Sequence, residues 1–399
     1  MPPLAGLKVL ELARVLAGPW AGQLLADLGG EVIKVESLAG DDTRRWGPPS
    51  VENADGTRDA AYFHACNRGK QSVAVDFSRP EGREIVGRLA AQSDVLIENF
   101  KVGGLKKFGL DYESLKPLNP RLVYCSITGF GQDGPHAARP GYDFMIQAMG
   151  GIMHVTGSPD GPPQKIGVAF VDVFTGVYAV VAIQAALAWR EKTGEGQHID
   201  MSLLDTTTSV LANQAMNYLV SGKSPSRMGN AHPNIVPYQE FATSDGHLIV
   251  AVGNDGQFAR LCEIVGLPEL ADDPLYATNE ARVVNRKALV AKLAERIRTF
   301  RRDDFLAVLE KAGVPVGPVN TVAQVFDEPQ VVHRGMCIDL PAGDGRTVPS
   351  VRSPIVMSGS PLTYEHASPR LGEHTDAVLG ALGYTEADLA RLRAARVVG

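Results

Sequence analysis

The chain has 399 residues, of which 44% are hydrophobic and 21% charged, a composition typical of a globular protein with a large core. A formal net charge of -6 argues against a nucleic-acid-binding protein, which usually carries a basic domain. Four scattered cysteines without a CxxC pair and nine dispersed histidines predict neither a disulfide framework nor a metal site. With no signal-peptide pattern and no apolar run of about 18 residues, we expect a cytoplasmic protein without membrane contact.

Strands and helices alternate in the first part of the chain. The segments LKVLEL (7–12) and EVIKVE (31–36) predict two buried strands, and the helix between them begins after Gly18-Pro19 and ends at Gly29-Gly30. Further strands are predicted at 72–77, 94–100 and 122–130, with a helix beginning at Pro80. Repeated strand–helix–strand units imply a parallel sheet, so we predict an α/β fold with a doubly wound, Rossmann-like sheet. The GxGxxG turn of nicotinamide-binding proteins is absent.

A long apolar helix follows a loop region. Residues 131–170 are rich in Gly and Pro, and we predict little regular structure there, as is common in functional loops. The segment 168–196 is apolar around its whole circumference and ends near Gly194, which predicts a central buried helix. A strand and another helix continue to about residue 220.

The second half predicts a smaller α/β domain. Ser, Pro, Gly and Asn are concentrated at 221–234, which indicates a domain boundary. A hairpin turning at Asp245-Gly246, amphipathic helices at 258–265, 287–299 and 303–311, and a strand near 314–320 follow. We therefore divide the chain into the first part of a large domain (1–200), a linker helix (201–225), a small domain (226–328) and a return to the large domain (329–399) with a last helix at 385–395.

Asp172 is the most conspicuous candidate for chemistry. It lies in GVAFVDVFTG, between Val171 and Val173, and burying a carboxylate is costly unless something compensates. One explanation is that Asp172 caps the central helix by accepting backbone N–H bonds. The other is a nucleophile held at a helix N-terminus in a dry pocket, and the two roles are compatible.

Basic side chains near predicted strand ends are candidate ligand contacts, because open α/β sheets bind ligands at the carboxyl ends of their strands. Each of them is equally compatible with a solvated surface. They are Arg44, Arg45, Lys70, Lys106 and Lys107.

Many segments, in order, resemble class III coenzyme A transferases, the formyl-CoA and carnitine CoA-transferase family. They include LKVLELARVLAGPWAGQLLADLGGEVIKVE, YFHACNRGKQSVAVDF, DVLIENF, GFGQDGP, GYDFMIQAMGG, VDVFTG, REKTGEGQHID and GEHTDAVL. The resemblance runs from about residue 4 to 395, nearly the whole chain.

The resemblance implies a large Rossmann-like domain built from both chain ends, a small central domain, and a homodimer of interlocked chains. It implies that Asp172 attacks an acyl-CoA donor and carries coenzyme A as an aspartyl thioester to a carboxylic acid acceptor. Coenzyme A is then a substrate, and no tightly bound cofactor is expected. By position, the implied CoA contacts are Val15, Leu16, Val75, Asp76, Phe77, Ser78, Asn99, Phe100, Lys101 and Lys107, while Tyr142 and Asp143 would face the thioester.

Departures from the family pattern bear on the substrate. The formyl-CoA enzymes carry glutamine at the position of Leu16 and a longer acid at that of Asp143, and their run of glycines is replaced here by GNAHPNIVPYQ. These features favour succinyl-CoA as donor and a dicarboxylic acid such as glutarate as acceptor. Arg44, Arg45 or His232 is then a candidate partner for the distal carboxylate of the acceptor.

Two alternatives remain open. The α-methylacyl-CoA racemases resemble this family but use a histidine in a GHD segment, where this chain has GYD with Tyr142. A tyrosine with a pKa of about 10 is a poor base at neutral pH, which favours transfer over racemisation. A CoA-binding protein without catalysis, in which Asp172 only caps a helix, is the second alternative.

Overall fold

The computed structural model describes residues 1–399, which form two compact units. Unit 1 comprises Met1–Ile152, Ile166–Ala215 and Gln330–Gly399, and unit 2 comprises Met153–Lys165 and Met216–Pro329. Both ends of the chain therefore belong to unit 1. The predicted functional division, with a separate linker at 201–225, stays a prediction.

Unit 1 is built on a six-stranded parallel sheet of order β5-β2-β1-β6-β7-β8. Its strands are β1 (Lys8–Glu11), β2 (Glu31–Glu36), β5 (Lys70–Ala74), β6 (Val95–Glu98), β7 (Val123–Thr128) and β8 (His198–Ser202). The chain adds strands outward from β1 as far as β5, then returns to the other side of β1 and continues to β8. This confirms the predicted doubly wound sheet, whose winding direction reverses between β1 and β6.

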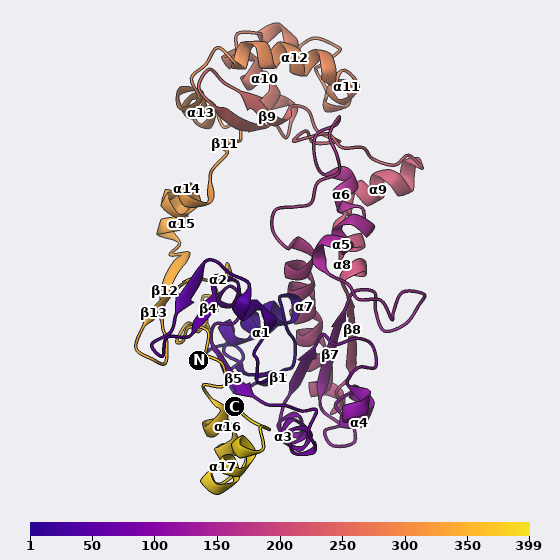
Figure 1. Cartoon of the computed structure of the whole chain (residues 1–399). Helices are drawn as coiled ribbons and strands as arrows, with labels where there is room; N and C mark the ends of the chain where they lie inside the picture. The colour runs from indigo at the N-terminus through magenta and orange to yellow at the C-terminus, as the bar shows by residue number, and fades with distance from the viewer. The chain divides into compact units, whose positions relative to one another are not determined.

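Helices cover both faces of this sheet. On one face, apolar residues of α1, α5, α7 and α8 pack against the strands, and on the other those of α3, α4, α16 and α17 do so. Figure 1 shows α16 and α17, in yellow, beside α3. The helices of unit 1 are α1 (Ala17–Asp27), α2 (Ala61–His64), α3 (Pro80–Ala91), α4 (Tyr112–Leu115), α5 (Asp143–Met149), α7 (Phe170–Thr193), α8 (Leu203–Val210), α16 (Thr375–Ala381) and α17 (Glu386–Ala394).

Smaller elements complete unit 1. Two antiparallel hairpins and two 3-10 turns lie outside the main sheet. They are β3 (Ser50–Glu52) with β4 (Arg58–Ala60), β12 (Cys337–Pro341) with β13 (Thr347–Val351), η1 (Asp42–Arg45) and η2 (Lys106–Phe108).

The C-terminal segment covers the outer edge of β5. The N–H of Ser72 donates to His374 Nδ1 at 3.3 Å, and the N–H of His374 donates to Ser72 O at 2.9 Å. Further along, the N–H of Gly399 donates to Ala74 O at 3.1 Å. An edge strand offers unpaired backbone groups to other chains, and these bonds remove that opportunity.

The central helix α7 confirms the prediction at 168–196, and Gly194 ends it in the left-handed conformation with φ 79°. Its predicted complete burial is wrong, because Val181 and Trp189 are 59% and 54% exposed. By length and composition alone α7 is also apolar enough to cross a membrane, a test that core helices of soluble proteins pass as well.

The loop prediction for 131–170 is wrong in part. This stretch contains α5 and the short α6 (Ile152–Val155). Gly141, Gly150 and Gly151 flank these helices and mark their ends, while 131–142 and 156–169 have little regular structure, as predicted. Helix α16 was not predicted either.

Unit 2 has a three-stranded antiparallel sheet of order β11-β10-β9. The strands β9 (Tyr238–Ala242) and β10 (His247–Ala251) form the hairpin predicted at Asp245-Gly246, and β11 is Val316–Pro318. The three predicted helices are confirmed as α10 (Asp255–Ile264), α12 (Arg286–Ile297) and α13 (Arg302–Lys311). The remaining elements of this part of the chain are α9 (Ala212–Ser221), η3 (Pro268–Ala271), α11 (Asn279–Val284), α14 (Val322–Asp327) and α15 (Pro329–His333).

Candidate active site

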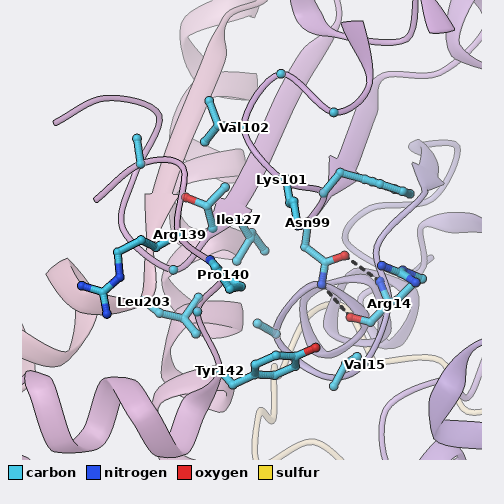
Figure 2. A pocket seen from close by; sticks show the side chains of 18 of the residues that line it. Arg14, Val15, Asn99, Lys101, Val102, Ile127, Arg139, Pro140, Tyr142 and Leu203 are labelled. Atoms are coloured by element: carbon cyan, nitrogen blue, oxygen red, sulfur yellow. Dashed lines mark hydrogen bonds between the residues drawn. The ribbon is translucent and has the colours of Figure 1, made fainter. Parts of the chain in front are cut away.

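A cavity of about 670 Å³ lies in unit 1 where the winding of the sheet reverses. Its walls come from residues 14–17 after β1, residues 99–104, 107 and 108 after β6, residues 127–129 at the end of β7, residues 137 and 139–142, Asp172 and Leu203. Figure 2 shows 18 of the lining residues, among them Arg14, Asn99 and Tyr142. Ligands of doubly wound sheets bind in this crevice at the carboxyl ends of the strands.

The structure brings together eight of the residues singled out from the sequence. All of them line the cavity, although they come from segments far apart in the chain. They are Val15, Leu16, Asn99, Phe100, Lys101, Lys107, Tyr142 and Asp172.

Both polar atoms of the Asn99 side-chain amide form hydrogen bonds with the neighbouring loop. Its Oδ1 accepts from the N–H of Arg14 at 2.9 Å, and its Nδ2 donates to Arg14 O at 2.6 Å, as the dashed lines in Figure 2 show. The amide therefore ties the segment after β6 to the segment after β1, across the reversal point.

Asp143, rather than Asp172, supplies the cap of α7. The first N–H groups of a helix lack intrahelical partners, and the N-cap residue Ala169 offers no side-chain acceptor. Asp143 Oδ1 accepts from the N–H of Val171 at 2.8 Å and from the N–H of Asp172 at 3.2 Å. The capping role considered for Asp172 is therefore wrong, and its own carboxylate is left to face the cavity.

Gln147 fixes the capping carboxylate, and sequence reasoning missed it. Its Nε2 donates to Asp143 Oδ2 at 2.7 Å, and its Oε1 accepts from the N–H of Ile166 at 2.9 Å. Gln147 is fully buried, so these bonds are shielded from water. Only its position four residues after Asp143, on one face of α5, signals this role in the sequence.

The environment raises the pKa of Asp172 from 3.8 to about 7, first because burial disfavours the charged form and second because Asp143 repels it. Strongly perturbed carboxylates in a crevice are a mark of functional sites. The pKa of Tyr62, which the sequence did not single out, rises to about 12 through burial and then through the charge of Asp172. The Tyr62 hydroxyl therefore keeps its proton at neutral pH.

Gly176 lets α7 approach the start of α1. A Cβ atom at this position would lie 2.7 Å from Ala17 O and 3.0 Å from a ring carbon of Trp20. Since Ala17 and Asp172 both line the cavity, this close approach contributes to its geometry.

Gly176→Ala is expected to lower the free energy of unfolding of unit 1 by roughly 1–3 kcal/mol through overpacking. We expect kcat to fall about 10- to 100-fold, because α1 and α7 must separate. All three tryptophans belong to unit 1, so urea titration followed by tryptophan fluorescence measures this loss. The matched control is Gly87→Ala in α3, where a Cβ atom meets nothing within 4 Å; there we expect unchanged activity and equal or higher stability. Equal behaviour of the two variants would contradict this explanation.

Four cations line the cavity, two of which the sequence analysis missed. Arg14 and Arg139 join the expected Lys101 and Lys107. Arg14 has a half-exposed ion pair with Asp42 at 3.7 Å, and its guanidinium lies 5.4 Å from the centre of the Phe100 ring. Such groups suit an anionic ligand that carries phosphates or carboxylates. Arg14 directly precedes the predicted contact Val15, which was a usable signal, whereas Arg139 lies in a loop that offered none.

Arg44 does not line the cavity. Its guanidinium forms two bonds to Glu36, at 2.8 and 2.7 Å, and an ion pair with Asp59 at 2.9 Å, and it stacks on the ring of Phe63. The side chain is buried and bonded to these partners. Its expected contact with a substrate carboxylate stays a prediction. Arg45 is exposed, bonds to Ala39 O and Asp42, and also lies outside the lining.

The segment 75–78 supports the cavity wall instead of lining it. Val75 is buried and pairs with Val398, and Ser78 donates twice to Asp76 Oδ1. Phe77 packs edge-to-face against two aromatic rings of the wall, those of Phe100 and Phe108. The expected direct contacts of this segment with CoA stay a prediction.

His232 belongs to unit 2 and is not among the lining residues. Its N–H donates to Tyr238 O at 2.9 Å, and its Nδ1 accepts from the N–H of Asn234 at 3.1 Å. Partial burial and the charge of Arg286 lower its pKa. Its expected contact with the acceptor acid stays a prediction.

The reversal-point crevice, its cations and the perturbed carboxylate together define an α/β enzyme for anionic substrates. The family model described as CoA-transferase family III matches residues 4–375, and the chain belongs to this family. It is a CoA-transferase, and CoA thioesters are its substrates.

Two curated relatives illustrate the similarity. The chain is 57% identical over 383 residues to a succinate–glutarate CoA-transferase of Agrobacterium fabrum, covering 96% of each protein. It is 44% identical to the human succinyl-CoA:glutarate CoA-transferase, covering 99% of this chain and 90% of the human protein.

Solved structures agree in fold. A CAIB/BAIF family protein from Brucella suis superposes with a TM-score of 0.85 at 63% identity, covering 95% of this chain and 99% of that one. A protein from Mycobacterium tuberculosis superposes with a TM-score of 0.83 at 30% identity, covering 95% and 99% of the two chains.

Proposed function

We propose that this enzyme transfers coenzyme A from succinyl-CoA to a dicarboxylic acid such as glutarate, with Asp172 as the nucleophile. The observation that carries the proposal is the Asp172 carboxylate, which lines the cavity at the sheet reversal with its pKa raised to about 7. The names of the relatives from Agrobacterium fabrum and human support the choice of donor and acceptor.

The proposed reaction runs through two covalent intermediates on Asp172 and conserves every group. The carboxylate attacks the thioester carbonyl carbon, the C–S bond breaks, and CoA is released as a thiolate. A mixed anhydride of Asp172 and succinate remains. The thiolate then attacks the Asp172 carbonyl carbon, releasing succinate and leaving an aspartyl-CoA thioester. The acceptor carboxylate repeats these steps in reverse, so acyl-CoA leaves and the Asp172 carboxylate is regenerated.

The remaining lining residues have proposed binding roles. Lys101, Lys107, Arg14 and Arg139 supply positive charge for the CoA phosphates and the distal carboxylate of the acid. The N–H groups of Leu16 and Ala17 precede the first hydrogen bond of α1, which Trp20 N–H donates to Leu16 O at 2.7 Å. Free N–H groups of this kind are suited to stabilise the oxyanions that develop during acyl transfer.

Mass spectrometry tests the covalent route. The enzyme is incubated with succinyl-CoA and treated with hydroxylamine or borohydride, and we expect a mass change confined to the peptide that contains Asp172. The change should disappear in Asp172→Ala. If no adduct forms with a panel of acyl-CoAs while the α-proton exchanges with deuterium, the racemase alternative replaces the proposal.

The pH dependence of the half-reaction follows from the raised pKa of Asp172. Only the ionised carboxylate can attack, so the rate of enzyme acylation should rise about tenfold per pH unit below pH 7 and level off above about pH 8. Rapid-quench mass spectrometry between pH 5 and 9 measures this rate. In Asp143→Asn the cap acceptor remains but the repelling charge is lost, so the midpoint should move to lower pH. A flat profile in the wild type would contradict the role of Asp172.

We also propose that the enzyme acts as a cytoplasmic homodimer. One side of α7 leaves apolar residues uncovered in the single chain, namely Phe174, Val177, Tyr178, Val181 and Trp189, each 36–59% exposed. A face of this kind suits a protein–protein contact. Three of the four cysteines are buried and free, as is usual in a reducing compartment. Size-exclusion chromatography with light scattering should give twice the mass of the chain.

A further inference from the structure

The loop that joins β1 to α1 has an unusual backbone. Val15, which lines the cavity, has φ 71°, in the left-handed region. A β-branched residue is rare there, because its Cβ substituents crowd the backbone. A conformation of this kind persists only when the surrounding structure enforces it.

Four side chains from outside this loop bond to its backbone. Lys34 Nζ donates to Ala13 O at 2.8 Å, and Asn99 bonds to both the N–H and the O of Arg14. The N–H of Val15 donates to the two carboxylate oxygens of Asp41 at 3.3 and 3.2 Å. On the far side, Cys66 Sγ lies 3.6 Å from Val15 O. Five consecutive polar groups of the backbone, from Ala13 O to Val15 O, therefore have side-chain partners.

We call Lys34, Asp41, Cys66 and Asn99 the clamp. Its two charged members, Lys34 and Asp41, form a buried ion pair. Lys34 Nζ lies 3.0 Å from Asp41 Oδ2, and both side chains are completely buried. Asp41 is held further by the N–H and hydroxyl of Thr43, at 3.0 and 2.8 Å. The nearby acids Glu11, Asp41 and Glu36 raise the pKa of Lys34, and Lys34 lowers that of Asp41. The pair therefore stays ionised across the working pH range.

Burying such a pair is a poor source of stability, because desolvation offsets most of the attraction. It does fix geometry, since each charge demands its partner at one place. Here the backbone of Val15 is held in place, and it directly precedes Leu16 and Ala17, two residues that line the cavity.

We propose that Lys34 and Asp41 are positioning residues for CoA transfer: they hold Val15 in the left-handed conformation and thereby set the start of α1 relative to Asp172. This inference rests on the proposed function, because it gives the loop a role in the transfer step. Neither residue lines the cavity, so the effect is transmitted through the backbone of residues 13–15.

The test combines Asp41→Asn with Val15→Gly. Asparagine keeps the shape of Asp41 but not the charge that holds Val15, so we expect kcat to fall about 30- to 100-fold with KM changed less than about threefold. Glycine adopts a positive φ without strain and does not need the clamp. The step from Val15→Gly to the double variant should therefore cost less than about fivefold in kcat, far less than the same change costs in the wild type. A crystal structure of Asp41→Asn should show Val15 at negative φ.

Asp27→Asn is the matched control. Asp27 is equally buried and pairs with Arg68 at 2.5 Å, but neither residue lines the cavity. This variant should have a lower free energy of unfolding, but the same kcat per folded enzyme as the wild type. Adding Val15→Gly should not change the effect of Asp27→Asn on kcat. If Asp41→Asn fails to fold, Cys66→Ala removes a single grip on Val15 O, and its smaller loss should likewise shrink in the Val15→Gly background.

If Asp41→Asn lowers kcat equally in the wild type and in the Val15→Gly background, the positioning role of Lys34 and Asp41 is refuted, while the proposed CoA transfer still stands. Failure of the wild type to transfer CoA would instead refute the proposed function, and the φ of Val15 in the Asp41→Asn crystal would still decide whether the clamp exists.

Discussion

Asp172→Asn is expected to lower kcat by about four to six orders of magnitude, as removal of a covalent nucleophile does in other enzymes. Asparagine has nearly the same shape, so binding of succinyl-CoA should persist. A coupled assay of glutaryl-CoA formation measures the rate, and quench-flow mass spectrometry checks that no aspartyl adduct forms. The control is Asp205→Asn, since Asp205 is the third residue of α8, as Asp172 is of α7, but lies outside the cavity. It should keep full activity.

The effect of the same variant on stability tests the raised pKa of Asp172. The folded-state pKa of Asp172, about 7, lies above its ordinary 3.8, so the folded protein binds this proton more tightly than the unfolded chain does. The contribution of Asp172 protonation to stability is therefore fully present below pH 3.8 and is lost as pH rises through about 7. At pH 8, Asp172→Asn should therefore be more stable than the wild type, by roughly 1–2 kcal/mol. A loss of stability in Asp172→Asn at pH 8 would contradict the raised pKa of Asp172.

Glu11→Ala is expected to cost about 3–5 kcal/mol in the free energy of unfolding of unit 1. Glu11 lies between two buried cations, with Lys34 Nζ 3.0 Å and Lys70 Nζ 2.8 Å from its carboxylate oxygens. All three side chains are completely buried, so the truncation leaves charges without their counter-ion in a dry interior. Urea titration followed by tryptophan fluorescence reports on unit 1 alone.

An exposed ion pair provides the comparison for Glu11. Glu52 lies 2.8 Å from Arg58, but the two side chains are 61% and 69% exposed. Glu52→Ala should cost less than about 1 kcal/mol. If Glu11→Ala also stayed below that value, water or a shift of Lys70 would have to neutralise the buried cations, and the assigned role of Glu11 would be wrong.

The sheet could be predicted from sequence because its information is local. The strands at 7–12 and 31–36 are apolar and bounded by turn residues, and the structure places β1 and β2 within those ranges. The reversal of winding direction then follows from repeated strand–helix–strand units, which locates the crevice.

The partners of individual side chains could not be predicted in this way. Arg14 and Arg44 both lie in segments that follow a strand, yet Arg44 bonds to Glu36 and Asp59 in the interior while Arg14 lines the cavity. Asp143 became the cap of α7 only because the chain returns to it 28 residues later, a contact that no local pattern encodes. The donor and acceptor acids were inferred from the family resemblance, not from the residues of the site.

The hydrogen bonds between β5 and the C-terminal segment have a consequence for biosynthesis. Unit 1 cannot complete the edge of β5 until residues 330–399 have been synthesised, since His374 and Gly399 bond to that edge. Most of unit 2, by contrast, is one continuous stretch from Met216 to Pro329. As the chain leaves the ribosome, unit 2 can reach its native state while the sheet of unit 1 still exposes an open edge. During that interval a nascent chain is open to strand addition by its neighbours, which makes chaperone protection most valuable between the emergence of Ala74 and that of Gly399.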